Sequence, residues 1–411
     1  MFTFLNLNSF AILVVVSTWG IKKQSLIIAL LIATFCSFLL KKHLKKVIVF
    51  QFIMALLVAP KLIPDVYNQF FTKDEWKHLP DNIVEAKFKR TPNIYVVQPD
   101  GYVSQKTLEN GLYKSRSGLY GWLEENNFKV YHDFRSNYPS TLVANASFFS
   151  MKHHYFGETL FPSLEMPRAR EIINGNNSVI KILQNNGYKS YFIVEDEYLQ
   201  QNFAKSYYNY QNISRNEIPV FSSGQNVKKD VHQDLENVLN ITSNQENPNF
   251  VFIEKLIPHH VHFEDTIEAE REDYLEKINK ANIWIKKTVS LINKKDPNAI
   301  ILIAADHGGW VGMGNYDSFH STNNNLLVNS IFSGLCAIKW SEIDGSNYDS
   351  KLKSTVNIFR ILFSALSEDT SYLNQLEEDD SYHLRKDKLF GLSVYKLINE
   401  KGEVIEDLRE K

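Results

Sequence analysis

The sequence predicts an α/β domain with a mostly parallel sheet flanked by helices, preceded by a transmembrane helical anchor. Three observations support this prediction. Three apolar runs open the chain of 411 residues; short apolar runs then alternate with amphipathic helical patterns; and polar side chains follow directly after several of the short runs. We therefore divide the chain into an anchor (1–65), a linker (66–90), an α/β domain (91–366) and a C-terminal extension (367–411).

The predicted anchor consists of apolar runs at about 4–21, 25–40 and 47–64, separated by short basic loops. Runs of this length are at the short end of what crosses a hydrocarbon core of ~30 Å. A signal peptide would carry positive charge before its apolar run, and none occurs before Lys22. We expect three membrane spans, with two spans and an interfacial helix as the alternative.

Charge sets the expected orientation of the anchor and excludes one class of partner. The second basic loop has four lysines and the first has two, so the second loop is expected to be cytoplasmic and the chain beyond residue 65 extracytoplasmic. Residues 1–65 carry +6 of a net charge of −2, which leaves about −8 for the remainder. An acidic soluble part argues against nucleic acid as a partner. Cys36 and Cys336 are too few for a disulfide scaffold or a cysteine-based zinc site.

The α/β domain is predicted from strands and helices that alternate along the chain. Near-continuous apolar runs such as 299–304 are typical of parallel strands buried on both faces. The longest helical pattern, 268–294, places Leu275, Ile278, Ala281, Ile285, Val289 and Ile292 on one face. The predicted strands are Ile94–Gln98, Ser190–Val194, Phe250–Glu254 and Ala299–Ala304, and the predicted helices are 117–126, 177–187, 230–242, 268–294 and 352–367.

Two strand ends carry residues that could ligate a metal. Functional groups in open α/β sheets gather just beyond the carboxyl ends of the strands. Asp100-Gly101 follows the first predicted strand, and Asp306-His307 follows the last. Carboxylate oxygen and imidazole nitrogen together suit zinc or manganese. The alternatives are an ordinary Asp-Gly turn and a helix cap beside a surface histidine.

A hydroxyl-rich segment and a group of histidines add further candidates. In the segment 136–147, hydroxyls at the start of a small-residue helix could simply cap it, or could place a nucleophile where the helix N-terminus attracts phosphate. His259, His260 and His262 cluster after the strand Phe250–Glu254, and His320 lies shortly beyond Asp306-His307. This clustering favours a metal site over isolated structural histidines.

The order of these motifs resembles the alkaline phosphatase/sulfatase superfamily, over roughly residues 91–366. Within it, the chain is most similar to membrane-anchored sulfatase-like proteins that include phosphoethanolamine and glycerol-phosphate transferases of the cell envelope. Residues 93–102 are similar to the first strand and metal acid of that family. Residues 136–151 are similar to its nucleophile segment, and residues 298–308 to its Asp-His-Gly strand.

The resemblance implies a role for individual residues. Asp100, Asp306 and His307 would hold a divalent ion, zinc or manganese, together with Thr141. Thr141 would be the nucleophile, with Ser140 as the alternative. His259 and His320 would face a second metal ion or the leaving group, with His260 and His262 as substitutes for His259. Arg360, on an amphipathic helix, is interpreted as structural.

The resemblance also implies a function and a location. The expected reaction is metal-dependent transfer of a phosphoethanolamine- or glycerol-phosphate-type group from a phospholipid donor to an envelope glycan or lipid. The expected location is a bacterial inner membrane, with the catalytic domain outside the cytoplasm. No Cys/Ser-x-Pro-x-Arg arrangement follows the first strand, which argues against a formylglycine sulfatase. A phosphodiesterase or phosphatase of the same fold and a degenerate, metal-free binding or assembly protein are the alternatives.

Overall fold

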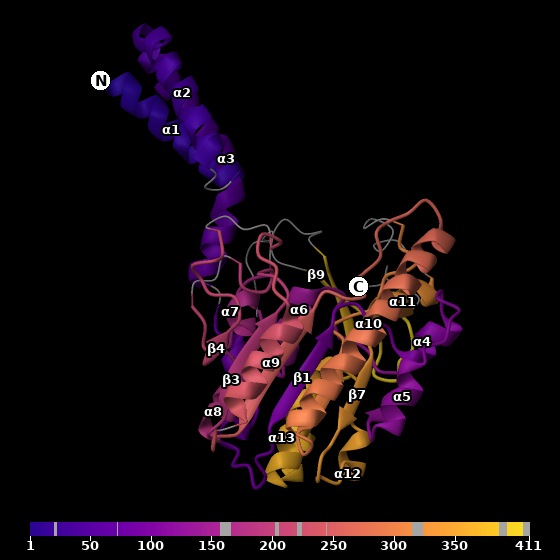
Figure 1. Ribbon diagram of the computed structural model, residues 1–411. Helices are drawn as coiled ribbons and strands as arrows, with labels where there is room; N and C mark the ends of the chain where they lie inside the picture. The colour runs from indigo at the N-terminus through magenta and orange to yellow at the C-terminus, as the bar shows by residue number, and fades with distance from the viewer. Residues whose placement is uncertain are drawn as a thin grey trace.

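The computed structural model describes residues 1–19, 23–71, 73–156, 166–201, 205–219, 224–243, 245–314, 324–385 and 393–405. An N-terminal group of helices stands apart from an α/β domain built on one sheet (Figure 1). The strands and helices alternate along the chain as the apolar periodicity predicts, which confirms the predicted fold class of the α/β domain.

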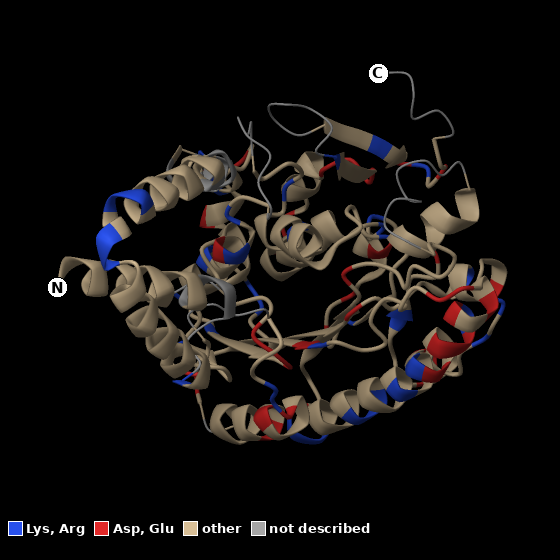
Figure 2. Cartoon of the chain, turned by 90° about the horizontal axis from the view of Figure 1, so that it is seen from above, with Lys and Arg blue, Asp and Glu red and all other residues tan. Residues whose placement is uncertain are grey.

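The three N-terminal apolar runs form the helices α1 (Phe2–Trp19), α2 (Lys23–Leu39) and α3 (Leu44–Phe71). Polar pairs join them: Asn6 and Gln51 exchange amide hydrogen bonds of 3.0 Å between α1 and α3, and Thr34 of α2 donates to Asn8 of α1 at 3.2 Å. The 3₁₀ turn Lys41–His43 joins α2 to α3, and this basic turn lies beside the N-terminus (Figure 2).

The membrane anchor stays a prediction. Among the described residues, no single helix is both long enough and apolar enough to cross a membrane. By length and composition, α2 and the segment Lys41–Leu57 could do so together, as a pair bent by 75°.

The core of the α/β domain is a seven-stranded sheet of order β2-β7-β6-β1-β5-β3-β4. The five strands from β6 to β4 are parallel, whereas β7 runs antiparallel to β6 and β2 antiparallel to β7. The bounds are β1 (Ile94–Pro99), β2 (Lys129–Val130), β3 (Lys189–Val194), β4 (Tyr210–Gln211), β5 (Asn249–Lys255), β6 (Ile300–Ala304) and β7 (Cys336–Lys339).

The central strands are apolar because helices cover both faces of the sheet. Side chains alternate between the two faces: Val96 of β1 packs into one core and Val97 into the other. One face is covered by α6 (Thr141–Ser150), α7 (Ala169–Ile173), α8 (Ser178–Asn185) and α13 (Ile358–Ser367). The other is covered by α4 (Gln105–Asn110), α5 (Leu119–Glu125), α9 (Val231–Thr242), α10 (Ile267–Lys295) and α11 (Asn325–Phe332).

The longest helix, α10, has the amphipathic pattern that the sequence predicts. Ile278, Ala281, Ile285, Val289 and Ile292 are buried against the sheet, and Leu275 is partly buried. Charged residues occur along its length, as the coloured stretches of the ribbon in Figure 2 show. The helix begins at Thr266, whose hydroxyl accepts a hydrogen bond from the Ala269 amide at 3.2 Å, and it ends before Asp296.

Two segments outside the seven-stranded sheet have ordered structure of their own. The segment expected to be a linker packs on the domain: Trp76 is completely buried and its indole donates to the carbonyl of Asn176 at 2.8 Å. The C-terminal extension forms the antiparallel pair β8 (Ser381–Arg385) and β9 (Ser393–Ile398). Within the described ranges, the remaining short helices are the 3₁₀ turns Glu75–Lys77, Ile83–Glu85, Thr355–Asn357 and Thr370–Gln375, and α12 (Ser346–Asp349).

Candidate metal centre

The candidate site lies at the carboxyl edge of the sheet, where β1 runs between β5 and β6. Both neighbours of β1 come much later in the chain, so the chain leaves β1 without pairing the next strand beside it. The order of the strands changes direction at β1. Such a switch point leaves a crevice beyond the strand ends. Asp100 follows β1, His259 follows β5, and Asp306 with His307 follows β6. The fold therefore brings three separate loops to one place.

Asp100, Asp306 and His307 are buried and converge tightly. One potential ligand atom from each lies within 4.8 Å of the other two. The Nε2 atom of His307 is 3.3 Å from Oδ1 of Asp100 and 3.4 Å from Oδ2 of Asp306. The second oxygen of Asp306 accepts hydrogen bonds from the amides of Gly101 at 3.1 Å and His307 at 3.0 Å, which fixes the carboxylate.

The chemistry of these three side chains fits a divalent metal ion. Within the described part of the chain, Oδ1 of Asp100 and Oδ2 of Asp306 are buried without a hydrogen-bond partner. Buried carboxylate oxygens without a partner are costly unless a cation faces them. Nδ1 of His307 donates to the carbonyl of Gly308 at 2.8 Å, so Nε2 carries the lone pair that a metal would use. The residues predicted from the sequence are thus brought together with suitable donor atoms.

The start of α6 carries the candidate nucleophile to this cluster. Thr141 is the first residue of α6, and its hydroxyl donates to Nε2 of His307 at 3.1 Å. Ser140 occupies the N-cap position, but its side chain makes no capping hydrogen bond. Neither hydroxyl therefore caps the helix, so the alternative of a purely structural role as a helix cap does not apply to Ser140 or Thr141.

His259 joins the cluster through Asp100. Its Nδ1 donates to Oδ2 of Asp100, the oxygen that does not face His307. Burial alone would raise the pKa of Asp100, but the hydrogen bond and positive charge of His259 hold that pKa below its usual value. Burial conversely would lower the pKa of His259, and the Asp100 carboxylate raises it instead. Burial raises the pKa of Asp306.

The structure separates the other histidine candidates. His260 is partly buried and stacks on Trp310, while His262 is an exposed residue whose Nδ1 lies 3.2 Å from Nζ of Lys277. His259 is therefore the member of the predicted trio that contacts a metal-site acid. His320 lies outside the described residues.

Three buried polar residues beside the site were not assigned a role from the sequence. Glu254, at the carboxyl end of β5, is buried near Asp100 and Asp306, and burial followed by the charge of Asp100 raises its pKa well above the usual value. Gln98 and Asn145 line a small cavity together with Asp306. Asn145 lies one helical turn after Thr141, and this spacing of four was the available sequence signal.

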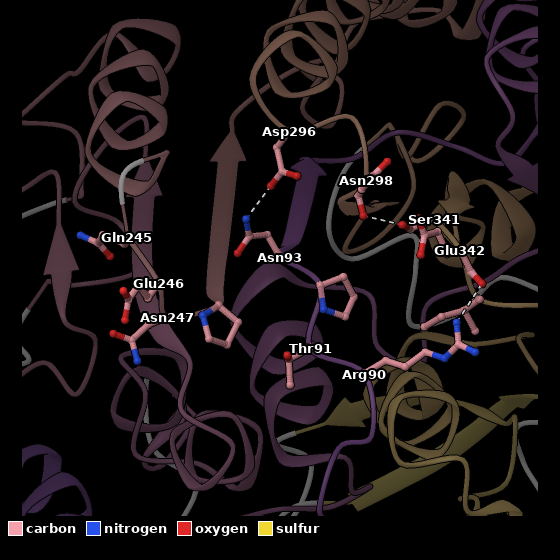
Figure 3. Close-up of a pocket in the computed structure, with 13 residues that line it drawn as sticks. Arg90, Thr91, Asn93, Gln245, Glu246, Asn247, Asp296, Asn298, Ser341 and Glu342 are labelled. Carbon is pink, nitrogen blue, oxygen red and sulfur yellow. Dashed lines mark hydrogen bonds between the residues drawn. The ribbon is translucent and has the colours of Figure 1, made fainter.

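A larger cavity, of about 510 Å³, lies at the opposite edge of the sheet, near the amino ends of β1, β5 and β6 (Figure 3). Its polar groups bond to one another: Asn93 donates to Asp296 at 2.6 Å, and Arg90 donates to the carbonyl of Glu342 at 3.2 Å. Its lining includes no histidine or cysteine. We therefore place the candidate site at the carboxyl edge.

The fold and the buried Asp-Asp-His cluster define a protein of the alkaline phosphatase/sulfatase superfamily. The family model described as sulfatase matches residues 115–335, more than half of the chain, and the chain belongs to that family. The predicted superfamily is thereby confirmed. No curated protein matches the chain by sequence.

Solved structures with the same fold include both transferases and sulfatase-related proteins. The integral membrane lipooligosaccharide phosphoethanolamine transferase A of Neisseria meningitidis is 12% identical, with a TM-score of 0.50 over 85% of this chain and 70% of that chain. A candidate sulfatase of Bacteroides fragilis is 13% identical, with a TM-score of 0.51 over 74% of this chain and 85% of that chain. At this identity the likeness establishes the fold.

Proposed function

We propose that this protein is a metal-dependent transferase that moves a phosphoryl-linked group through Thr141. The group would be of phosphoethanolamine or glycerol-phosphate type, the donor a phospholipid, and the acceptor a glycan or lipid of the cell envelope. The observation that carries the proposal is the contact between Thr141 and His307 at the edge of a buried Asp-Asp-His cluster. A threonine hydroxyl there is suited to forming a phosphoester intermediate.

Asp100, Asp306, His307 and Thr141 would hold the zinc or manganese ion. When bound, such an ion would lower the pKa of the Thr141 hydroxyl and stabilise charge on the phosphate oxygens. The protein's own contribution is to position these groups. The backbone amides of Gly101 and His307 fix Asp306, and the carbonyl of Gly308 fixes the ring of His307.

The reaction would proceed in two displacements. Deprotonated Oγ1 of Thr141 attacks the phosphorus of the donor diester; a bond from this oxygen to phosphorus forms, and the bond from phosphorus to the lipid alcohol breaks. Nε2 of protonated His259 gives its proton to the leaving alcohol. In the second displacement, an acceptor hydroxyl gives its proton to His259 and attacks the phosphothreonine, which releases Thr141 and completes the cycle.

His259 is suited to this role by its exposure and its partner. Asp100 binds Nδ1, so Nε2 is the atom left to exchange a proton with a substrate. The His259 side chain is 37% exposed, in contrast to the 1% of His307. A partly exposed imidazole that contacts a metal-site acid is suited to proton transfer to a leaving group.

The arrangement of the helices supports a membrane-bound donor. The helices α1–α3 lie at the end of the sheet that carries the site (Figure 1). An anchor in an inner membrane, with the domain outside the cytoplasm, would therefore place the site towards lipid headgroups. The lysine-containing turn between α2 and α3 lies at the end of these helices away from the sheet (Figure 1), where the cytoplasmic surface is expected.

The proposal is tested by trapping the intermediate on the full-length protein in detergent. 4-Nitrophenyl phosphoethanolamine is mixed with the zinc-loaded protein, and the reaction is quenched with acid. The protein is then digested, and the modified peptide is identified by mass spectrometry. We expect phosphoethanolamine on Thr141 in the wild type and in Ser140→Ala, and none in Thr141→Ala. Elemental analysis should find zinc or manganese in the wild type and a loss in the Asp306→Ala, His307→Ala double variant.

The alternatives give different results in the same experiments. Modification of Ser140 would overturn the nucleophile assignment. Release of free phosphoethanolamine at the same rate with and without a glycan or lipid acceptor would support a phosphodiesterase. Absence of metal from the wild type after dialysis against excess zinc and manganese would favour the metal-free binding protein.

A further inference from the structure

Four aromatic rings form a row at the rim of the candidate site. The ring centroids of His259 and His260 are 4.0 Å apart, and those of His260 and Trp310 are 4.5 Å apart, with the latter two rings nearly parallel at 12°. The Trp310 ring also lies 5.5 Å from that of the proposed metal ligand His307. The row thus joins the loop after β5 to the loop after β6.

The backbone around this row is unusual for the residues that it contains. His259 and Trp310 both have positive φ, +64° and +66°, in the left-handed region that side chains other than glycine rarely adopt. Such conformations persist only where the surrounding structure holds them, and they often occur at functional sites. His259, at one end of the row, and Trp310, between His260 and His307, are therefore both held in uncommon conformations.

Close backbone packing fixes the two loops against their neighbours. A Cβ atom on Gly309 would lie 2.2 Å from the ring of Tyr274, so only glycine fits directly before Trp310. The amide of Val261 donates to the carbonyl of Gly309 at 2.9 Å, which ties the two loops together. Trp310 itself is 7% exposed, so its ring is held within the protein and is not a free surface group.

We propose that Trp310 and His260 are positioning residues that orient His259 for proton transfer. The hydrogen bond to Asp100 fixes one ring nitrogen of His259 but leaves the tilt of the ring to other contacts. The ring of His260, backed by Trp310, supplies that contact at a centroid distance of 4.0 Å and an interplanar angle of 38°. Neither residue touches the reacting atoms. This inference rests on the proposed function, because it requires His259 to be the proton donor.

The expected signature is a loss that depends on the leaving group. A nitrophenolate leaves without help from an acid, whereas an alkoxide needs a proton. The full-length zinc-loaded protein is assayed with the 4-nitrophenyl and n-hexyl esters of phosphoethanolamine, with zinc content measured for each variant. We expect Trp310→Ala and His260→Ala to lower the single-turnover rate of alcohol release, which reports the first displacement alone, about tenfold on the hexyl ester and less than about threefold on the nitrophenyl ester, because general acid catalysis contributes ~100-fold or more.

Two further variants make the result specific. Trp310→Phe keeps an aromatic face and should retain most of the activity on the hexyl ester. Trp122→Ala removes a tryptophan on α5 that packs against Lys286, away from the site, and should leave the rates on both esters unchanged. KM for both esters should be unchanged in the Trp310 variants, because Trp310 acts through the ring of His260 and does not itself bind the substrate.

The outcomes separate this inference from the proposed function. Equal losses on the two esters, or no loss on either, would overturn the positioning role. A hexyl-specific loss in His259→Ala without one in Trp310→Ala or His260→Ala would also overturn it, while the proposed function stands. If His259→Ala shows no loss specific to the hexyl ester, His259 is not the proton donor, and this inference fails with that assignment. Transfer through Thr141 is tested separately, by mass spectrometry of the trapped peptide.

Discussion

Replacing Gly101 by alanine should damage both stability and the site, by an amount that the structure allows us to estimate. Gly101 has φ +71°, and a Cβ atom there would lie 2.8 Å from the carbonyl carbon of His259 and 3.0 Å from the amide nitrogen of His260. Optimal contacts between carbon atoms are roughly 3.5–4.0 Å, so the two loops would have to separate by about 0.7 Å or more. Both contacted atoms are backbone, so no flexible side chain can move aside.

Two further glycines separate the contributions. Gly187 has φ +81° with nothing within 4 Å of its Cβ position, so Gly187→Ala causes only the strain of a left-handed backbone, about 1–2 kcal/mol. Part of this cost is offset because alanine lowers the conformational entropy of the unfolded chain. Gly121 lies within α5 in open space, and Gly121→Ala should stabilise by about 0.5–1 kcal/mol. Gly101→Ala adds an overpacking cost of about 1–3 kcal/mol to the strain.

The assay is thermal unfolding of the three variants of the full-length protein in detergent, followed by kcat on the n-hexyl ester. We expect stability to rise for Gly121→Ala, to fall slightly for Gly187→Ala, and to fall most for Gly101→Ala. Only Gly101→Ala should also lose activity, by about tenfold to a hundredfold, because misplacement by ~1 Å can cost that much. Equal stability of Gly101→Ala and Gly187→Ala would refute the close approach of the two loops.

Two other predictions concern stability. Burial lowers the pKa of His153 to about 4, so between about pH 6.5 and pH 4 the His153 ring is neutral in the folded state and protonated in the unfolded state. The contribution of His153 to the free energy of unfolding should therefore be complete above about pH 6.5. It should fall by up to about 3 kcal/mol as the pH drops towards 4. Urea unfolding at pH 7 and pH 4.5 should show a smaller difference for His153→Gln than for the wild type, and an identical difference would contradict the assignment. Arg360 is buried with its guanidinium 2.6 Å from Asp81, so Asp81→Ala should destabilise by about 3 kcal/mol, measured by the same unfolding at pH 7. Unchanged stability would mean that the buried charge finds another partner.

The sequence was most informative where burial was most complete. The runs that become β1, β3, β5 and β6 are apolar on both faces because the strands are central and covered by helices. β7 was missed because its four residues are too few for a periodic signal, and β2 and β4 are shorter still. The packing of Trp76 was also missed, because a single apolar residue in a polar segment carries no period.

The candidate site could be predicted in part for a similar reason. Asp100, Asp306 and His307 follow central strands directly, and parallel strands deliver such residues to a common edge. The choice among His259, His260 and His262 depends on the left-handed turn at His259 and on the approach of Gly101 to that loop. Both are properties of the tertiary packing, which spacing along the chain does not encode.

The two oxygens of Asp100 face different partners, and this constrains how the protein can evolve. One oxygen faces Asp306 and His307, and the other holds His259. A glutamate at this position would move both oxygens outward by one methylene, so it could not serve one partner without displacing the other. A lineage that exchanges this acid would therefore have to change the length or path of the loop carrying His259 in the same step. We expect the two positions to vary together among related chains.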